Sequence, residues 1–220
     1  MRMAVSALLA CVAVAASGWP ASAQPAPPPV PPVSDAAAAA GLIDVRTVVP
    51  DAVIDLRYAT PDNFVGEQMY PADARCLVDE SMAAGLATAA EILRNGDEAL
   101  VFFDCYRPQD VQVRMYDEVS EPGWVSKPGP YAHSHEAGLS VDVSLARGGA
   151  LVDMGTGFDE FTPRANAYAT DGVSAAAQAN RARLREAMAA GGFTVYKGEW
   201  WHFDASGAYA QNPILDVPVN

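Results

Sequence analysis

The three histidines of this 220-residue chain are the side chains best suited to chemistry, and they lie in two short segments. His133 and His135 precede Asp142, and His202 lies near the C-terminus. Imidazole and carboxylate groups are zinc ligands, and a catalytic zinc site typically uses three protein ligands and leaves a position open for water. His135, Asp142 and His202 could supply such a set. On spacing alone this signal is weaker than paired Cys-x-x-Cys, and a single histidine is more often a surface or hydrogen-bonded core residue.

The segment between His135 and Asp142 can turn both side chains toward one site. Gly138 permits a change in chain direction between them. The alternation of Asp142 with its two flanking valines directs the carboxylate away from the face that carries the valines. Residues 141–145 therefore predict a half-buried strand.

The elements that must position these residues are those of an α+β domain. Cap residues and helical spacing predict three helices, at residues 79–93, 108–119 and 174–190. We expect Pro108 in the first turn of the second helix and Gly191 at the end of the third. Short apolar runs predict further strands at residues 99–103, 193–196 and 200–203.

The charge of the chain limits its partners. It carries 27 acidic and 14 basic side chains, for a formal net charge of −13. Such a chain repels phosphate backbones and anionic lipid, and no basic patch offsets this. We therefore expect neither nucleic acid nor a membrane surface as a partner.

The N-terminal 23 residues predict a secretory signal peptide. They contain one positive charge at Arg2, an apolar stretch over residues 4–16 and a small-residue cleavage sequence that ends at Ala23. We expect cleavage after Ala23 and a periplasmic or secreted protein. The lesser alternative is lipoprotein processing at Cys11. The apolar run is well short of the ~20 residues that span a bilayer, so no integral membrane segment is expected after processing.

A tether is expected to follow the signal peptide, over residues 24–41. Six prolines fall within residues 24–32, and five alanines follow Asp35. Proline at this density favours extended polyproline II structure. The folded domain is then expected to cover residues 42–220.

Five segments of this domain together carry a resemblance to a known family. They are Leu56–Phe64 (LRYATPDNF), Asp104–Pro108 (DCYRP), His133–Asp142 (HSHEAGLSVD), Asp153–Asp159 (DMGTGFD) and Glu199–Phe203 (EWWHF). In this order they resemble the D-alanyl-D-alanine dipeptidases, zinc peptidases of the vancomycin-resistance type in peptidase family M15. The resemblance implies a single domain with a small, mostly antiparallel sheet flanked by helices and one zinc ion bound on the sheet. It also implies hydrolysis of the small dipeptide D-Ala-D-Ala in cell-wall peptide turnover.

The resemblance assigns roles around the metal. His135, Asp142 and His202 match the zinc ligands. Glu199 matches the general base, which takes a proton from the zinc-bound water and delivers it to the leaving amine. Residues three apart point to opposite faces of a regular strand. For Glu199 and His202 to address one metal, the backbone between them must bulge or turn.

The resemblance also assigns residues that face the substrate. Arg107 matches the arginine that stabilises the developing oxyanion. Tyr58 and Asp159 match groups that hold the free ammonium of the substrate. Two plainer interpretations stay open: Arg107 as a structural ion-pair partner, and Asp159 as part of a solvated acidic face with Glu160.

His133 departs from the resembled pattern, which usually has serine two residues before the first zinc histidine. The larger ring could donate a hydrogen bond near the substrate, narrow the pocket or act as an extra ligand, and we favour the donor. His133 and its neighbour Ser134 are therefore candidate substrate-binding residues.

Cys76 and Cys105 are the two cysteines that remain after signal-peptide cleavage. An exported protein meets an oxidising compartment, which favours a disulfide between them. Two buried thiols are the alternative, because sequence does not give the distance between the two Cα atoms.

Two other functions stay open alongside the dipeptidase. One is a related metallo D,D-carboxypeptidase or endopeptidase that acts on longer wall peptides. The other is a non-catalytic wall-peptide binding module. The sequence carries no signal for the oligomeric state.

Overall fold

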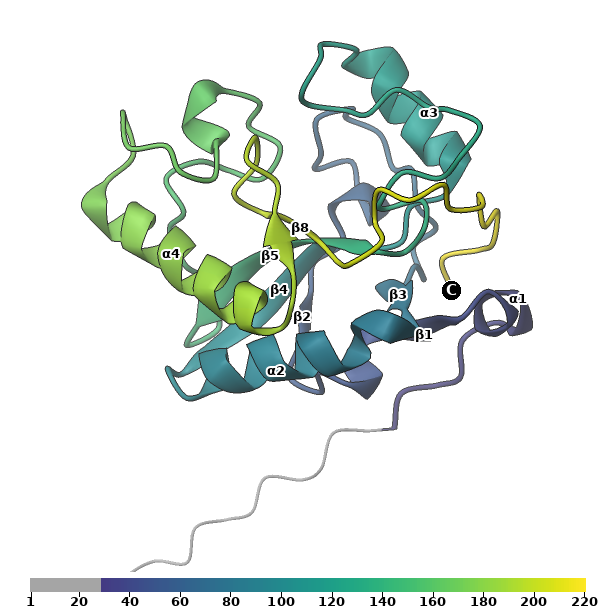
Figure 1. Ribbon diagram of the computed structural model, residues 1–220, viewed down its shortest axis with the longest axis horizontal. Coiled ribbons are helices and arrows are strands. Elements are labelled where there is room, and N and C mark those ends of the chain that lie inside the picture. Colours follow the sequence, from purple (N-terminus) through teal and green to yellow (C-terminus); the bar gives the residue numbers. More distant parts are fainter. Residues whose placement is uncertain (1–28) are drawn as a thin grey trace, which may run out of the picture.

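The computed structural model describes residues 29–220 (Figure 1). The expected signal peptide, its cleavage site at Ala23 and Cys11 lie outside the described residues. Among residues 29–220, every helix is too short or too polar to cross a bilayer.

A mostly antiparallel sheet forms the centre of the domain, with strand order β2-β4-β5-β8-β7 and with β6 paired to β5. Only the β2–β4 pair is parallel among the described strands. The strands are β2 (Val53–Ile54), β4 (Glu98–Asp104), β5 (Ser140–Arg147), β6 (Ala150–Leu151), β7 (Thr194–Val195) and β8 (His202–Asp204). The α+β fold and the small, mostly antiparallel sheet are as expected.

Two helices pack together against this sheet, α2 (Ala83–Arg94) and α4 (Ala175–Ala190) (Figure 1). Their backbones approach so closely that a Cβ on Gly85 would lie 2.2 Å from the carbonyl oxygen of Gly191. The apolar faces of both helices share one buried cluster with β4 and β5. This core includes the valines on either side of Asp142, so the carboxylate of Asp142 leaves the sheet on the opposite face.

A second, smaller sheet lies beside the first and pairs β1 (Leu42–Asp44) with β3 (Leu77–Asp79) in antiparallel fashion. Helix α3 (Gln109–Glu118) packs in a separate cluster with the C-terminal residues. The short 3₁₀ helices are η1 (Val45–Thr47), η2 (Arg57–Ala59), η3 (Glu80–Met82) and η4 (Pro163–Ala165).

The fold begins earlier than the expected boundary at Leu42. Helix α1 (Asp35–Ala39) starts at Ser34, whose hydroxyl accepts from the Ala37 N–H at 3.3 Å. Ala37 is fully buried, and the Ser34 N–H donates to the C-terminal Asn220 carbonyl. A capping serine before a run of alanines is a good helix start, so the end of the expected tether is part of the domain.

Two local expectations also need correction. The strand expected to be half-buried, β5, is buried on both faces from Ser140 to Ala146: its valines face the apolar core, and on the other face Ser140 contacts Asp204 and Asp142 contacts His135. Pro108 is the N-cap of α3 and not part of its first turn.

Candidate active site and metal centre

Strand pairing brings two of the three candidate ligands together. In the antiparallel β5–β8 pair, Asp142 lies directly opposite His202. His135 comes from the turn before β5, and Gly138 closes that turn with a φ of 67°. A Cβ on Gly138 would lie 2.7 Å from Leu42 Cδ2. Glycine therefore meets both the conformational and the packing demand of this turn.

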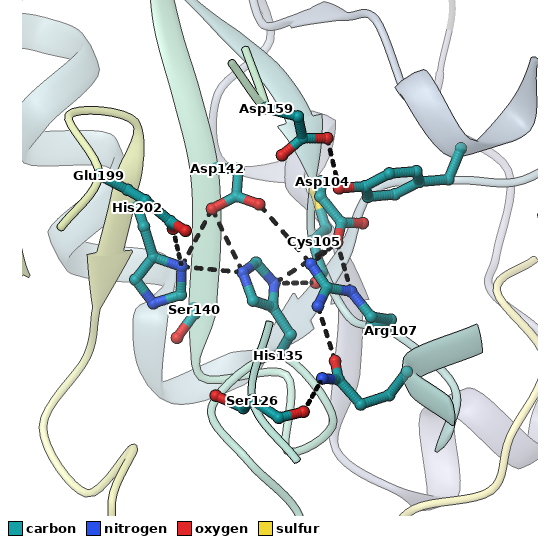
Figure 2. A network of polar contacts seen from close by, with 12 residues as sticks. Asp104, Cys105, Arg107, Ser126, His135, Ser140, Asp142, Asp159, Glu199 and His202 are labelled. Atoms are coloured by element: carbon teal, nitrogen blue, oxygen red, sulfur yellow. Dashed lines mark hydrogen bonds and ion pairs between the residues drawn. The ribbon is translucent and has the colours of Figure 1, made fainter. Parts of the chain in front are cut away.

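The three ligand atoms form a nearly equilateral triangle (Figure 2). His135 Nε2 lies 3.3 Å from Asp142 Oδ1 and 3.1 Å from His202 Nδ1, and the last two atoms are 3.1 Å apart. Zinc held tetrahedrally at 2.0–2.1 Å places its ligand atoms about 3.3 Å from one another. The donor types and their separations both fit one tetrahedral ion.

Hydrogen bonds on the far side of each imidazole leave the inward nitrogen free for a metal. His135 Nδ1 lies 2.7 Å from the Cys105 carbonyl, and His202 Nε2 lies 2.8 Å from Asp204 Oδ1. Each outer nitrogen must donate to its oxygen partner, so the neutral ring has its lone pair on the inward nitrogen. Burial raises the pKa of Asp204, but hydrogen bonds from His202, Ser140 and Tyr209 outweigh it and hold the pKa below its usual range.

Glu199 reaches the same site from a turn, as its spacing from His202 required. The Glu199 N–H donates to the Tyr196 carbonyl, and the Tyr196 N–H donates to the His202 carbonyl. This tight loop before β8 places Glu199 Oε2 4.0 Å from His202 Nδ1. Burial raises the pKa of Glu199 to about 8, against the opposing effect of His202.

Arg107 forms an ion pair with Asp104 and also lines the site. Its Nε and Nη2 donate to Asp104 Oδ2 at 2.9 and 2.7 Å, and Nη1 donates to Gln112 Oε1 at 2.7 Å. The Tyr70 hydroxyl also donates a hydrogen bond to Asp104, at Oδ1. The Nη2 atom also lies 3.8 Å from Asp142 Oδ2 (Figure 2). A buried cation is therefore held rigidly beside the candidate metal ligands.

Tyr58 and Asp159 meet at the other side of the site, where the Tyr58 hydroxyl donates to Asp159 Oδ2 at 2.8 Å. Asp159 has a φ of 56°, in the left-handed region that is uncommon outside glycine. Burial raises its pKa, and the negative charges of Asp142 and Glu199 add to this. The neighbouring Glu160 instead pairs with Arg164 at 2.6 Å. Asp159 is therefore separate from a solvated acidic face.

One cavity of about 230 Å³ is lined by all the candidate site residues, namely Tyr58, Arg107, His133, Ser134, His135, Asp142, Asp159, Glu199 and His202. The Nε2 atom of His133 lies 2.7 Å from the Lys127 carbonyl. His133 is also outside the group of three residues whose ligand atoms meet within residues 29–220.

The sequence did not single out three buried polar residues that support the site: Asp104, Gln112 and Asp204. Asp104 is the first residue of the Asp104–Pro108 motif, and Asp204 directly follows the Glu199–Phe203 motif, so proximity to Arg107 and His202 was the available signal. Gln112 lies outside every motif. Its role depends on contacts with Arg107 and the Ser126 carbonyl, which the sequence does not show.

A disulfide joins Cys76 and Cys105, whose Cα atoms are 5.2 Å apart. It connects the start of β3 to the segment between β4 and Arg107. Of the two alternatives for these cysteines, the structure has the bonded pair.

Comparisons with known proteins match the chain to one peptidase family. The profile of the Peptidase_M15 family, described as D-ala-D-ala dipeptidase, matches residues 38–220. The D-alanyl-D-alanine dipeptidase of Escherichia coli K12 is 37% identical over 175 residues, which cover 79% of this chain and 89% of the relative. A dipeptidase of the same name from Enterococcus faecium is 31% identical over 186 residues, covering 75% and 91% of the two chains.

Among solved structures, the LD-carboxypeptidase LdcB matches with a TM-score of 0.46 and 18% identity, covering 81% of this chain and 75% of that one. The family match and the two relatives extend over most of the folded chain. The protein is therefore an enzyme that belongs to the Peptidase_M15 family of D-Ala-D-Ala dipeptidases.

Proposed function

We propose that the protein hydrolyses the dipeptide D-Ala-D-Ala, with one zinc ion held by His135, Asp142 and His202. The convergence of these three ligand atoms with Glu199, Arg107 and the Tyr58–Asp159 pair around one cavity carries this proposal. The names of the relatives from Escherichia coli and Enterococcus faecium support the choice of substrate.

The protein side chains have separate tasks in this reaction. When bound, the ion supplies a Lewis acid that polarises the scissile carbonyl and lowers the pKa of water. Glu199 takes a proton from the attacking water at its carboxylate and delivers it to the nitrogen of the departing D-alanine. Arg107 stabilises the negative charge that develops on the carbonyl oxygen, because its guanidinium is already fixed by Asp104 and needs little reorganisation.

The other end of the cavity selects a free amino terminus. Asp159 offers a carboxylate to the substrate ammonium, and the Tyr58 hydroxyl holds that carboxylate in place. An ammonium there also offsets the negative charges of Asp142 and Glu199, which lie close enough to raise the pKa of Asp159. A blocked amino terminus would leave the Asp159 carboxylate without an ammonium partner.

The cellular setting forms part of the same proposal. The features of residues 1–23 support export to the periplasm or secretion, with cleavage after Ala23. In that setting the reaction belongs to turnover of cell-wall peptides. Sites with His₂Asp ligands accept other divalent ions, so the identity of the metal is tested together with the reaction.

The test compares free D-Ala-D-Ala, its N-acetylated form and the L,L-dipeptide, using metal-stripped protein before and after addition of Zn²⁺. We expect turnover of the free D,D-dipeptide alone, and only with metal. Equal rates on free and N-acetylated substrate would instead indicate a carboxypeptidase or endopeptidase of longer wall peptides.

The Glu199→Ala variant tests the base in the same assay. We expect it to bind the dipeptide and the metal with little turnover. Full activity in this variant would exclude Glu199 as the base. A wild-type protein that binds the dipeptide but stays inert with added Zn²⁺ would indicate a binding module.

A further inference from the structure

The Cys76–Cys105 disulfide has no part in the chemistry above, yet it adjoins the candidate metal centre. The carbonyl oxygen of Cys105 is the hydrogen-bond partner of His135 Nδ1, at 2.7 Å (Figure 2). The Arg107 N–H donates to the His135 carbonyl at 3.1 Å. Residues 105–107 therefore contact His135 through both its ring and its backbone.

Little of the central sheet holds the Cys105 backbone in place. The register of the β4–β5 pair shifts between Phe102 and Asp104, and β4 ends at Asp104. Beyond that point the segment is joined to the smaller sheet instead. The Tyr106 N–H donates to the Leu77 carbonyl at 2.8 Å, and the disulfide bonds Cys105 to Cys76.

Cys76 itself is well anchored. It directly precedes β3, which pairs with β1, and its carbonyl accepts from the Val45 N–H at 3.0 Å. Both half-cystines are about 1% exposed, within the apolar core. The disulfide thus ties the Cys105 carbonyl, which faces His135, to the smaller sheet.

We propose that this disulfide positions the Cys105 carbonyl against His135 Nδ1–H, so that the disulfide-bonded chain binds zinc more tightly than the dithiol chain. The inference rests on the proposed ligand set. The carbonyl keeps the proton on Nδ1 and orients the ring, which leaves Nε2 as the ligand atom. Loss of such an outer partner of a ligating histidine typically weakens metal affinity about 10- to 100-fold.

This arrangement couples metal loading to the redox state of the chain. Formation of the bond joins the two Sγ atoms and passes two electrons and two protons to an external disulfide, which leaves as a dithiol. Thiols persist in the cytosol and disulfides in oxidising compartments. A chain that has not been exported would therefore hold zinc weakly, and the exported chain would hold it tightly.

The test measures the zinc dissociation constant of the full chain by competition with a chromophoric chelator. The Cys76→Ala/Cys105→Ala double variant is compared with wild type and with Leu184→Ala, a buried α4 substitution that destabilises the core without contacting the site. Circular dichroism fixes a temperature at which all three proteins are folded. We expect about tenfold or weaker zinc binding in the double variant and an unchanged constant in Leu184→Ala.

The absorption spectrum of the Co²⁺-loaded protein gives a second readout, because it reports ligand geometry and not stability. We expect it to change in the double variant and to match wild type in Leu184→Ala. Equal zinc dissociation constants and equal spectra in all three proteins would overturn the proposal. The disulfide would then serve only to stabilise the fold.

The Asp142→Asn variant separates this inference from the proposed function. If Asp142→Asn loses zinc but the double variant keeps wild-type affinity, only the role of the disulfide is wrong. If Asp142→Asn binds zinc as wild type does, the ligand set itself is wrong.

Discussion

The cavity has two sides that are held in different ways. On one side the metal-ligand region, formed by His135, Asp142 and His202, is fixed by strand register and by an outer partner for each imidazole. On the other side lies the wall segment, residues 119–132, which connects α3 to the ligand-bearing turn and lines the cavity at residues 123–126.

Val125 and Trp124 of the wall segment pack against apolar residues, and side chains from other parts of the chain donate hydrogen bonds to its backbone carbonyls. The donors, with their acceptors, are Tyr196 to Gly123, Gln112 to Ser126, His133 to Lys127 and Gln109 to Gly129, at 2.7–3.3 Å. A backbone bridge also pairs Ala132 with Asn212. Segments secured by a few exchangeable hydrogen bonds open more readily than paired strands. The difference indicates a rigid metal-ligand region and a more adjustable wall segment.

Arg107 lies between the two sides, and its replacement is expected to lower kcat more than any other change considered below. Arg107→Lys keeps a positive charge but loses the planar fork that donates to both Asp104 and Gln112. We expect kcat to fall about 10²- to 10³-fold, the usual cost of losing an oxyanion donor. Steady-state kinetics and zinc content check this together. Wild-type kcat with normal zinc content would reduce Arg107 to a structural ion-pair partner.

Asp204→Asn tests the rigidity of the metal side. The amide oxygen that this substitution introduces would still accept from His202 Nε2–H, but without the charge that makes the ring a stronger ligand. We expect zinc affinity to fall about 10- to 100-fold while kcat at saturating zinc changes little. Chelator competition measures the affinity, with Asp117→Asn as an exposed control that lies outside the cavity lining. A lower kcat at full zinc loading would show that Asp204 acts in the reaction itself.

The same contrast separates what the sequence could predict from what it could not. The candidate ligands lie within named motifs, and the turn at Glu199 followed from its three-residue spacing to His202. The direction of Asp142 followed from alternation with valines. Strand β5 was nevertheless expected to be half-buried, because alternation does not reveal that His135, His202 and Asp204 cover its polar face.

The supporting contacts lay beyond sequence reasoning because they join distant residues. The Ser140–Asp204 hydrogen bond spans 64 positions, and the His135–Cys105 bond spans 30. Such pairs exist only once the strand order is set. The start of the domain was missed for a different reason: the alanines after Ser34 were grouped with the neighbouring prolines, although they form a capped and partly buried helix.

The smallest expected effect tests whether the two sides are coupled. Gln112 accepts from Arg107 Nη1 and donates to the Ser126 carbonyl, both at 2.7 Å, and is about 1% exposed. Gln109 donates to the Gly129 carbonyl of the same wall segment, and no hydrogen bond joins it to Arg107 among the described residues. The two glutamines therefore form a matched pair on α3.

Gln109→Met and Gln112→Met each remove one hydrogen bond to the wall segment, worth about 0.5–1.5 kcal/mol. We expect both to raise KM for D-Ala-D-Ala by about 2- to 10-fold, because the free wall segment must be ordered when substrate binds. Only Gln112→Met should also lower kcat, since it alone frees the guanidinium of Arg107. Equal kcat values in the two variants would mean that Asp104 is enough to hold Arg107, and that the wall segment moves independently of the cation that faces the reacting carbonyl.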